Sequence, residues 1–277
     1  MAQNWTAQTD KDSFTVNSKF PAAFSAHVGV LVTGGAKRIG KAIVGDLAAH
    51  GFAVAIHCNG SMTEGEALAE KIRTAGGQAV AIQADLCDPD AARALVKEAQ
   101  SALGLPIRLL VNNASVFVED HVGGLEDNIW DRHFALHLKA PVLLAESMAA
   151  ALSEGEDGLV VNMIDQRVWK PNPLFFSYTL SKAALWNATR TLAQALAPRI
   201  RVNAIGPGPT LPSERQEERD FQRQVGAIPL RKGPTLSDFG LTIRYLWEMK
   251  SVTGQMIALD GGQHLAWETP DILGISE

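Results

Sequence analysis

A tyrosine and a lysine spaced four residues apart could exchange a proton with a bound molecule. Tyr178 and Lys182 lie in the segment Ser-Tyr-Thr-Leu-Ser-Lys, and Asp165 precedes the tyrosine by thirteen residues. A spacing of four places the phenol and the ammonium on one side of a helix, one turn apart. At about 5 Å and an effective dielectric of about 20, the cation stabilises a phenolate by roughly 3 kcal/mol, on the order of two pKa units. The pair predicts a tyrosine with a lowered pKa that acts in proton transfer, with an exposed helical pair as the alternative.

A glycine-rich segment far upstream could bind the phosphates of a dinucleotide. Residues Thr33 to Gly40 join an expected strand to an expected helix. Glycines such as Gly34 and Gly40 allow a tight turn, and the helix start offers free N–H groups and a favourable dipole to a pyrophosphate. Such a turn also occurs without a ligand, but its position in the first βα unit favours cofactor binding.

The end of the second expected strand favours NADP(H) over NAD(H). Sites for NAD usually carry an acid about 20 residues after the loop, where it holds the ribose 2′-hydroxyl. Here the strand is followed by Asn59 and Ser61, and no acid appears before Glu64. These two side chains could donate hydrogen bonds to a 2′-phosphate. Lys37 and Arg38 supply positive charge nearby, unless they are plain surface charges.

Composition and charge narrow the classes of partner. The chain has 277 residues, 46% hydrophobic and 20% charged, enough for one sizeable core. A net charge of −5 and a pI near 5.8 argue against nucleic acid as a partner. Cys58 and Cys87 form neither a metal-ligand spacing nor a disulfide framework, which is typical of a protein in a reducing compartment. No apolar stretch approaches the roughly 20 residues that span a bilayer, and residues 1–26 lack a signal-peptide pattern. We expect a cytoplasmic protein without a membrane partner, with residues 1–26 as a mobile extension.

Short β-rich runs alternate with helical patterns, which is typical of an α/β fold with a doubly wound, mainly parallel sheet of about seven strands and helices on both faces. The expected strands are Val28–Thr33, Ala53–Cys58, Ala79–Gln83, Ile107–Val111, Leu159–Met163, Ile200–Ala204 and Met256–Leu259. The expected helices lie near 38–50, 63–75, 89–103, 126–152, 176–197, 213–225 and 237–248. No linker divides residues 27–277, so we expect one domain. The stretch from Gly206 to Pro234 is long for a connection, and such loops often carry function.

Taken together, these segments resemble a classical short-chain dehydrogenase/reductase, which has a Rossmann-type fold. The resemblance covers almost everything from Val28 to His264. It is carried by Thr33–Gly40, Ala84–Leu86, Asn112–Ala114, Tyr178 with Lys182, Asn203–Gly208 and Thr253–Gly262. The resemblance implies that these residues hold NADP(H): Gly34, Lys37, Arg38, Ile39, Gly40, Asn59, Ser61, Asp85, Leu86, Asn113, Ala114, Ser115, Lys182, Pro207, Gly208 and Thr210. It also implies a homotetramer.

Three positions depart from the general pattern of that family. Arg38 stands where the common loop has a glycine, Asp165 replaces the usual serine, and His137 replaces a structural asparagine. The arginine and the aspartate are similar to those of pteridine reductases and the related bacterial dihydromonapterin reductases.

A short segment is also similar to those enzymes. Asn-Ala-Ser-Val-Phe, residues 113–117, resembles their Asn-Ala-Ser-x-Phe. The resemblance implies that Ser115 contacts a pterin and that Phe117 stacks on it. Gly60 departs from it, because pteridine reductases often place an arginine for the 2′-phosphate there.

An aspartate at position 165 changes which bonds can be reduced. In ketone reduction, negative charge grows on oxygen, and an ionised Asp165 would repel it. In reduction of a ring C=N bond the nitrogen needs a proton, which a carboxyl beside Tyr178 can relay if burial or a neighbouring charge raises its pKa. We expect Asp165, Tyr178 and Lys182 to be catalytic, and Ser115, Phe117, Asp165 and Tyr178 to contact the substrate.

The expected activity is therefore NADPH-dependent reduction of a pteridine-like ring, such as a dihydropterin or dihydrofolate. A general carbonyl or alcohol dehydrogenase and a catalytically silent dinucleotide-binding protein are the alternatives.

Two histidines one helical turn apart could ligate a metal ion. His133 and His137 have this spacing, but no third ligand is suitably spaced, so we expect no metal. A buried, hydrogen-bonded His137 that organises water or Lys182 is the preferred interpretation. Trp169 lies between Asp165 and Tyr178 in the sequence and could border the substrate.

Overall fold

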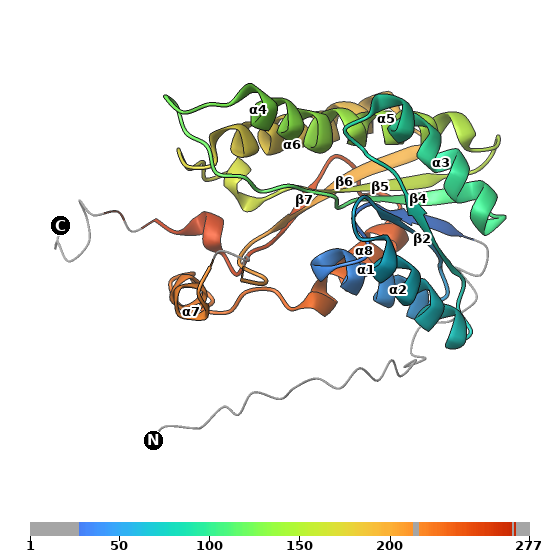
Figure 1. The fold of residues 1–277 in the computed structure, drawn as a ribbon, viewed down its shortest axis with the longest axis horizontal. Helices are drawn as coiled ribbons and strands as arrows, with labels where there is room; N and C mark the ends of the chain where they lie inside the picture. The colour runs from blue at the N-terminus through green and yellow to red at the C-terminus, as the bar shows by residue number, and fades with distance from the viewer. Residues whose placement is uncertain (1–27, 213–215, 268, 270–277) are drawn as a thin grey trace, which may run out of the picture.

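A computed structural model describes residues 28–212, 216–267 and 269 as one parallel sheet between two layers of helices (Figure 1). The proposed extension of residues 1–26 lies outside the described residues, as do residues 213–215 at the start of one expected helix. The strands are β1 Gly29–Val32, β2 Ala53–Cys58, β3 Ala79–Gln83, β4 Ile107–Asn112, β5 Gly158–Met163, β6 Ile200–Pro207 and β7 Met256–Leu259. This architecture confirms the α/β fold and the seven parallel strands expected from the sequence.

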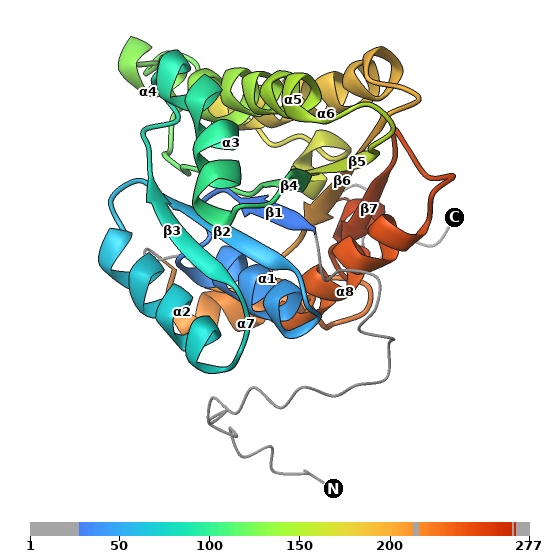
Figure 2. The ribbon, with the colours of Figure 1, turned by 90° about the vertical axis from the view of Figure 1, so that its right-hand side faces the viewer.

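The strand order is β3-β2-β1-β4-β5-β6-β7, and all neighbouring strands are parallel (Figure 2). The order reverses between β1 and β4, since the chain builds outward from β1 in one direction and then from β4 in the other. Ligands of such sheets bind beyond the carboxyl ends of the strands at this reversal. The loops that follow β1, β4 and β5 are therefore placed at the expected site.

Helices cover both faces of the sheet (Figures 1 and 2). Their bounds are α1 Arg38–Ala49, α2 Met62–Thr74, α3 Pro89–Leu103, α4 Asp127–Phe134, α5 Ala140–Ala151, α6 Phe176–Ala195, α7 Glu218–Gly226 and α8 Leu236–Glu248. One hydrophobic cluster joins the sheet to α1, α2 and α8, and a second joins it to α3, α5 and α6. The two clusters explain why the central strands are apolar on both faces.

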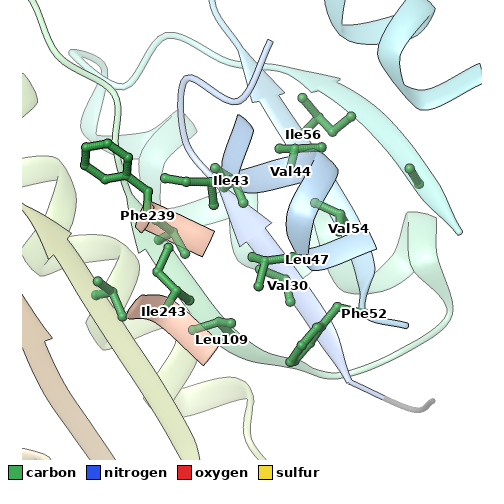
Figure 3. Packing of buried hydrophobic residues seen from close by; sticks show 14 of the residues in the cluster. Val30, Ile43, Val44, Leu47, Phe52, Val54, Ile56, Leu109, Phe239 and Ile243 are labelled. Carbon is green, nitrogen blue, oxygen red and sulfur yellow. The ribbon is translucent and has the colours of Figure 1, made fainter. Parts of the chain in front are cut away.

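Alternate residues of β1 serve the two layers. Val30 belongs to the cluster beneath α1 and α8, whereas Leu31 belongs to the opposite one. Leu47 of α1 and Ile243 of α8 belong to the same cluster as Val30 (Figure 3), and all three are fully buried. This packing holds β1, and with it the glycine-rich loop that follows, in a fixed place.

The structure differs from the expected helix over residues 126–152. A π-helical turn, η2 Ala135–Lys139, interrupts it between α4 and α5. Pro141 has no N–H to donate, and its ring crowds the carbonyl of His137 four residues earlier, so regular helical bonding fails here. Such turns are frequent at functional sites, and this one carries His137.

Two further boundaries differ near the long stretch that begins at Gly206. Strand β6 continues to Pro207, because Ala204–Pro207 pair with β7. The helix expected over 213–225 begins, among the described residues, at Glu218.

The run Asp127–Ala151 joins α4, η2 and α5. It is 25 residues long and contains an 18-residue window with a mean hydropathy of 1.2, so among the described residues it is long and apolar enough to cross a membrane by length and composition. By length and composition, the expectation that no apolar stretch approaches the length of a membrane span is therefore wrong for this run. Leu144 and Met148 of this run pack in the core beside α3, as in the core helix of a globular domain.

Candidate active site

The loops after β1 and β4 are locked together by one threonine and one asparagine. The Thr33 hydroxyl accepts hydrogen bonds from the backbone N–H groups of Asn113 and Ala114, each at 2.9 Å. The Asn113 amide donates to the carbonyls of Thr33 at 2.9 Å and Gly34 at 3.1 Å. Asn113 therefore shapes the glycine-rich loop itself, at the point where the strand order reverses.

Within the loop, glycine is required at two positions. Gly34 has a φ of +61°, in the left-handed region. A Cβ on Gly40 would lie 2.2 Å from the Gly34 carbonyl oxygen, closer than any side chain can approach. The loop therefore passes tightly over the start of α1, whose Lys37 N-cap makes no side-chain cap hydrogen bond. Its first N–H groups are suited to an anion.

His57 supports this loop, and sequence reasoning treated it only as a strand residue. Its Nε2 lies 3.1 Å from the Ala84 carbonyl, which can only accept, so Nε2 carries the proton. Its Nδ1 then accepts the Gly34 N–H at 3.1 Å. Burial lowers the pKa of His57, which favours this neutral form. The polar side chain in the otherwise apolar run Ala-Val-Ala-Ile-His-Cys was the available signal.

Arg38 connects the cofactor loop to the stretch after β6. Its φ is +51°, a left-handed conformation at the position where the common family pattern has a glycine. Its guanidinium donates to the carbonyls of Leu211 at 3.4 Å and Pro212 at 3.0 Å. The contact reaches across 174 positions of sequence, which no local pattern could reveal.

The residues proposed for the 2′-phosphate lie together near the end of β2. Lys37 forms a salt bridge of 2.8 Å with Glu64, and the Lys37 contact holds the pKa of Glu64 below its usual value. Ser61 is the N-cap of α2 and makes no side-chain cap hydrogen bond, and the Asn59 carbonyl accepts from Gln83 at 2.9 Å. A 2′-phosphate here would share Lys37 with Glu64.

The other proposed cofactor residues lie at the ends of neighbouring strands. Asp85 follows β3 and accepts the Cys87 N–H at 2.9 Å, and Leu86 is buried. Beyond β6, the Gly208 N–H donates to the Leu259 carbonyl at 2.9 Å, and the Thr210 hydroxyl donates to the Gly208 carbonyl at 3.0 Å. All of these proposed residues come shortly after a strand, at the edge of the sheet where the carboxyl ends of the strands lie.

Asp165, Tyr178 and Lys182 meet beyond the end of β5. The Tyr178 hydroxyl donates to Asp165 Oδ2 at 3.0 Å. Lys182 Nζ lies 5.8 Å from the centre of the Tyr178 ring and donates to the Met163 carbonyl at 2.8 Å. Tyr178 and Lys182 are both buried. The spacing of four on α6 thus brings phenol and ammonium to one place, as the sequence predicts.

The expected lowering of the Tyr178 pKa is wrong. Burial, and after it the Asp165 carboxyl, raises the pKa of Tyr178 well above its ordinary value. Burial also lowers the pKa of Lys182 to about 8, so the ammonium itself is poorly solvated. The four-residue spacing reveals neither the desolvation of the phenol nor the nearby carboxyl, and these outweigh the opposing charge of Arg167.

The expected rise in the pKa of the Asp165 carboxyl is confirmed. Burial raises the pKa of this carboxyl, against the opposing effects of Arg167, Tyr178 and Lys182. Tyr178 therefore remains a protonated hydrogen-bond donor, and Asp165 is the stronger acid of the pair.

Aromatic rings lie over this trio. Phe117 meets the Tyr178 ring edge-on at 4.8 Å and stacks on Phe175 at 4.0 Å. The Arg167 guanidinium lies 5.1 Å and 5.3 Å from the two phenylalanine rings, within cation–π distance. Its Nη1 is buried with no hydrogen-bond partner among the described residues. Sequence reasoning missed Phe175 and Arg167, although both lie in the segment between Asp165 and Tyr178.

Trp169 is 42% exposed, and its ring packs edge-on against His264 at 4.9 Å. Its contact with substrate stays a prediction.

His137 is buried and hydrogen-bonded, as expected, but its side-chain partners are serines rather than Lys182. Its Nδ1 lies 2.9 Å from the Ser181 hydroxyl, and its Nε2 lies 3.0 Å from the Ser115 hydroxyl. Burial and the charge of Lys182 hold the pKa of His137 well below its usual value. His133 pairs with the Ser177 hydroxyl at 2.6 Å. Within the described residues no group of three His, Cys, Asp or Glu side chains is placed to hold a metal ion.

Comparisons with known proteins agree with this geometry. A family model described as short chain dehydrogenase matches residues 29–223. The 3-oxoacyl-[acyl-carrier-protein] reductase FabG of Staphylococcus aureus is 30% identical over 240 residues, which cover 85% of this chain and 97% of that protein.

Solved structures are similar over the same region. The crystal structure of FolM alternative dihydrofolate reductase 1 from Brucella canis, complexed with NADP, is 70% identical with a TM-score of 0.87. The match covers 89% of this chain and 98% of that one. A blue fluorescent protein from a metagenomic library, in complex with NADPH, is 30% identical with a TM-score of 0.77, over 85% of this chain and 97% of that one.

The lowered pKa of Lys182 predicts a pH limit on NADPH affinity. The ammonium is present below about pH 8 and is lost above it, so a site that uses this charge should weaken up to about tenfold per pH unit above that value. Fluorescence titration of NADPH between pH 6.5 and 9.5 measures it. A Lys182→Arg variant, which stays charged, should show no such fall whatever its absolute affinity. A wild-type dissociation constant that is flat across this range contradicts the prediction.

Proposed function

The chain belongs to the short-chain dehydrogenase family, and we propose that it reduces a pteridine ring, of the dihydropterin or dihydrofolate kind, with NADPH. One observation carries the proposal: the half-buried Asp165 carboxyl, whose pKa is raised by burial, accepts a hydrogen bond from Tyr178. The family commonly has a serine at this position, which suits a developing alkoxide. A carboxyl that can be protonated suits a ring nitrogen instead.

Similarity to the Brucella canis protein supports the same substrate class. That protein, 70% identical to this chain, is named an alternative dihydrofolate reductase and was crystallised with NADP. A second NADP complex from Brucella suis, under the same name, has the same identity.

The residues around the cofactor loop fit NADP(H). Gly34 and Gly40 let the loop pack tightly against Asn113 and the start of α1, whose first N–H groups would receive the pyrophosphate, and Lys37, Asn59 and Ser61 would hold the 2′-phosphate. Lys182 would bind the nicotinamide ribose. When bound, NADPH would supply the hydride for the carbon of the ring C=N bond.

Reduction also requires a proton on the ring nitrogen. Because the pKa of Tyr178 is raised above its ordinary value, Asp165 in its protonated form is the better donor. The Tyr178 hydroxyl would then donate its hydrogen bond to the carboxylate that forms, and water would return the proton to Asp165. Phe117 would stack on the flat ring. Arg167 Nη1, a buried donor without a partner among the described residues, would meet a polar edge of the ring.

A general carbonyl reductase is the second candidate. The 30% identity to the FabG reductase of Staphylococcus aureus favours it. Against it, Asp165 in its ionised form would repel the negative charge that grows on a carbonyl oxygen, and only in its protonated form could it donate a hydrogen bond there.

We also propose a cytoplasmic homotetramer without nucleic acid or membrane as partner. Leu241 and Tyr245 of α8 are about half exposed, and an apolar helix face of this kind is suited to a neighbouring subunit. Sedimentation equilibrium tests it, and a monomer at micromolar concentration contradicts it.

The activity is tested by NADPH oxidation with dihydrobiopterin, dihydromonapterin and dihydrofolate beside a panel of ketones. We expect turnover of at least one reduced pteridine well above that of every ketone, and a preference for NADPH over NADH. A preference for simple ketones would establish the general carbonyl reductase instead.

An Asp165→Asn variant tests the proton donor. The amide keeps the shape and can still pair with Tyr178, but it has no proton to transfer, so we expect a loss of about 10²–10⁴ in kcat. In the wild type the acid form persists to a higher pH than in free aspartate. Turnover should therefore be full below the raised pKa and fall as pH rises through it. The variant should lack this fall, and an unchanged kcat in Asp165→Asn would remove Asp165 from the mechanism.

A further inference from the structure

The hydrogen bonds of His137 determine which of its nitrogens carries the proton. The Ser181 hydroxyl donates to the Tyr178 carbonyl at 2.7 Å, and a carbonyl can only accept. A serine hydroxyl has a single proton, so Ser181 must accept from its other neighbour, His137 Nδ1, at 2.9 Å. His137 Nδ1 is therefore protonated.

A contact on the opposite side of the His137 ring independently requires the same tautomer. The Val116 backbone N–H donates to His137 Nε2 at 3.1 Å. This bond requires a lone pair on Nε2, so Nε2 carries no proton. His137 is buried in the π-helical turn η2 with both nitrogens engaged, so a single neutral tautomer satisfies all of its contacts.

The tautomer of His137 in turn orients the hydroxyl of Ser115. Ser115 Oγ lies 3.0 Å from Nε2, and two lone pairs facing each other at this distance would repel. The Ser115 proton therefore lies between the two atoms and shares the single Nε2 lone pair with the Val116 N–H, because the other acceptor, the Val116 carbonyl, is 3.5 Å away. The exposed side of the Ser115 hydroxyl then carries only lone pairs, which accept hydrogen bonds.

We propose that His137 is a positioning residue that makes Ser115 an obligate hydrogen-bond acceptor, so that the site selects rings that present an N–H donor at this point. The substrate preference rests on the proposed function, since Ser115 must contact the ring. The amino group of a 2-amino-4-oxo pteridine is such a donor. A ring with a carbonyl in its place would set oxygen lone pairs against those of Ser115, and a buried polar mismatch is strongly disfavoured.

The tautomer is tested without any substrate. In ¹⁵N-histidine-labelled protein, long-range ¹H–¹⁵N spectra distinguish a protonated Nδ1 from a protonated Nε2, and the His137→Gln variant identifies the signal of His137. We expect a protonated Nδ1 and an unprotonated Nε2. His57, whose bonds require the opposite tautomer, is an internal control. A protonated Nε2 in His137 overturns the proposal.

The substrate preference is tested with two variants of different reach. A glutamine oxygen at position 137 can extend to the place of Nε2 and accept from Ser115 and Val116. An asparagine reaches only the place of Nδ1, so Ser115 is released and can turn its proton outward. Both variants are assayed with dihydrobiopterin and with the matching dihydrolumazine, which has a 2-oxo group in place of the amino group.

For the wild type we expect a KM that favours the 2-amino ring by at least about tenfold. His137→Asn should lose most of that preference and His137→Gln should keep it, even if both have a lowered kcat. An equal preference in His137→Asn and the wild type overturns the role of His137. Turnover of neither ring by the wild type overturns the proposed function and the substrate preference together, while the spectra decide the tautomer separately.

Discussion

The hydrogen bond between the buried Tyr178 hydroxyl and the half-buried Asp165 carboxyl, 3.0 Å long, governs the chemistry of this site. Burial raises the pKa of both partners, so the pair tends to keep its protons. Lys182 cannot reverse this, because its own ammonium is buried and its pKa falls to about 8. A site of this kind delivers a proton to a basic atom more readily than it stabilises an oxyanion, which accords with a ring nitrogen as the acceptor.

The fold holds this bond in place from three directions. Asp165 follows β5, a strand buried over its whole length, and its Oδ1 accepts the Arg167 N–H. Tyr178 lies in the first turn of α6, where both carboxylate oxygens of the buried Asp120 accept the Ser177 N–H at 3.1 Å. Asp120 thereby ties the segment that carries Phe117 to the helix that carries the tyrosine. His137 joins the same helix to Ser115 from the π-helical turn, so the ring contacts and the proton donor belong to one connected network.

Much of the fold and the composition of the site could be predicted from the sequence, because both depend on local patterns. Apolar runs of strand length located all seven strands, and the four-residue spacing brought Tyr178 and Lys182 together. The direction of the Tyr178 pKa could not be obtained in this way, since it depends on how much water the complete fold removes. The hydrogen bond of Gly34 to His57 and the contact of Arg38 with Pro212 join positions far apart in the chain, so no local pattern indicates them. The π-helical turn has a local cause in Pro141. The sequence shows this proline, but its effect follows only from the hydrogen bond that the carbonyl of His137, four residues earlier, would otherwise accept.

The most direct test replaces Asp165 with the serine common in the family and compares two substrates in each protein. We expect Asp165→Ser to lose most of its turnover of a dihydropterin, while turnover of simple ketones stays equal or rises. Both rates are measured by NADPH oxidation at one pH. Their ratio is compared between the two proteins, because a general loss of folded enzyme lowers both rates equally and cancels. A ratio that the substitution leaves unchanged would contradict the proposed role of Asp165, because the carboxyl would then have no part in choosing the bond that is reduced.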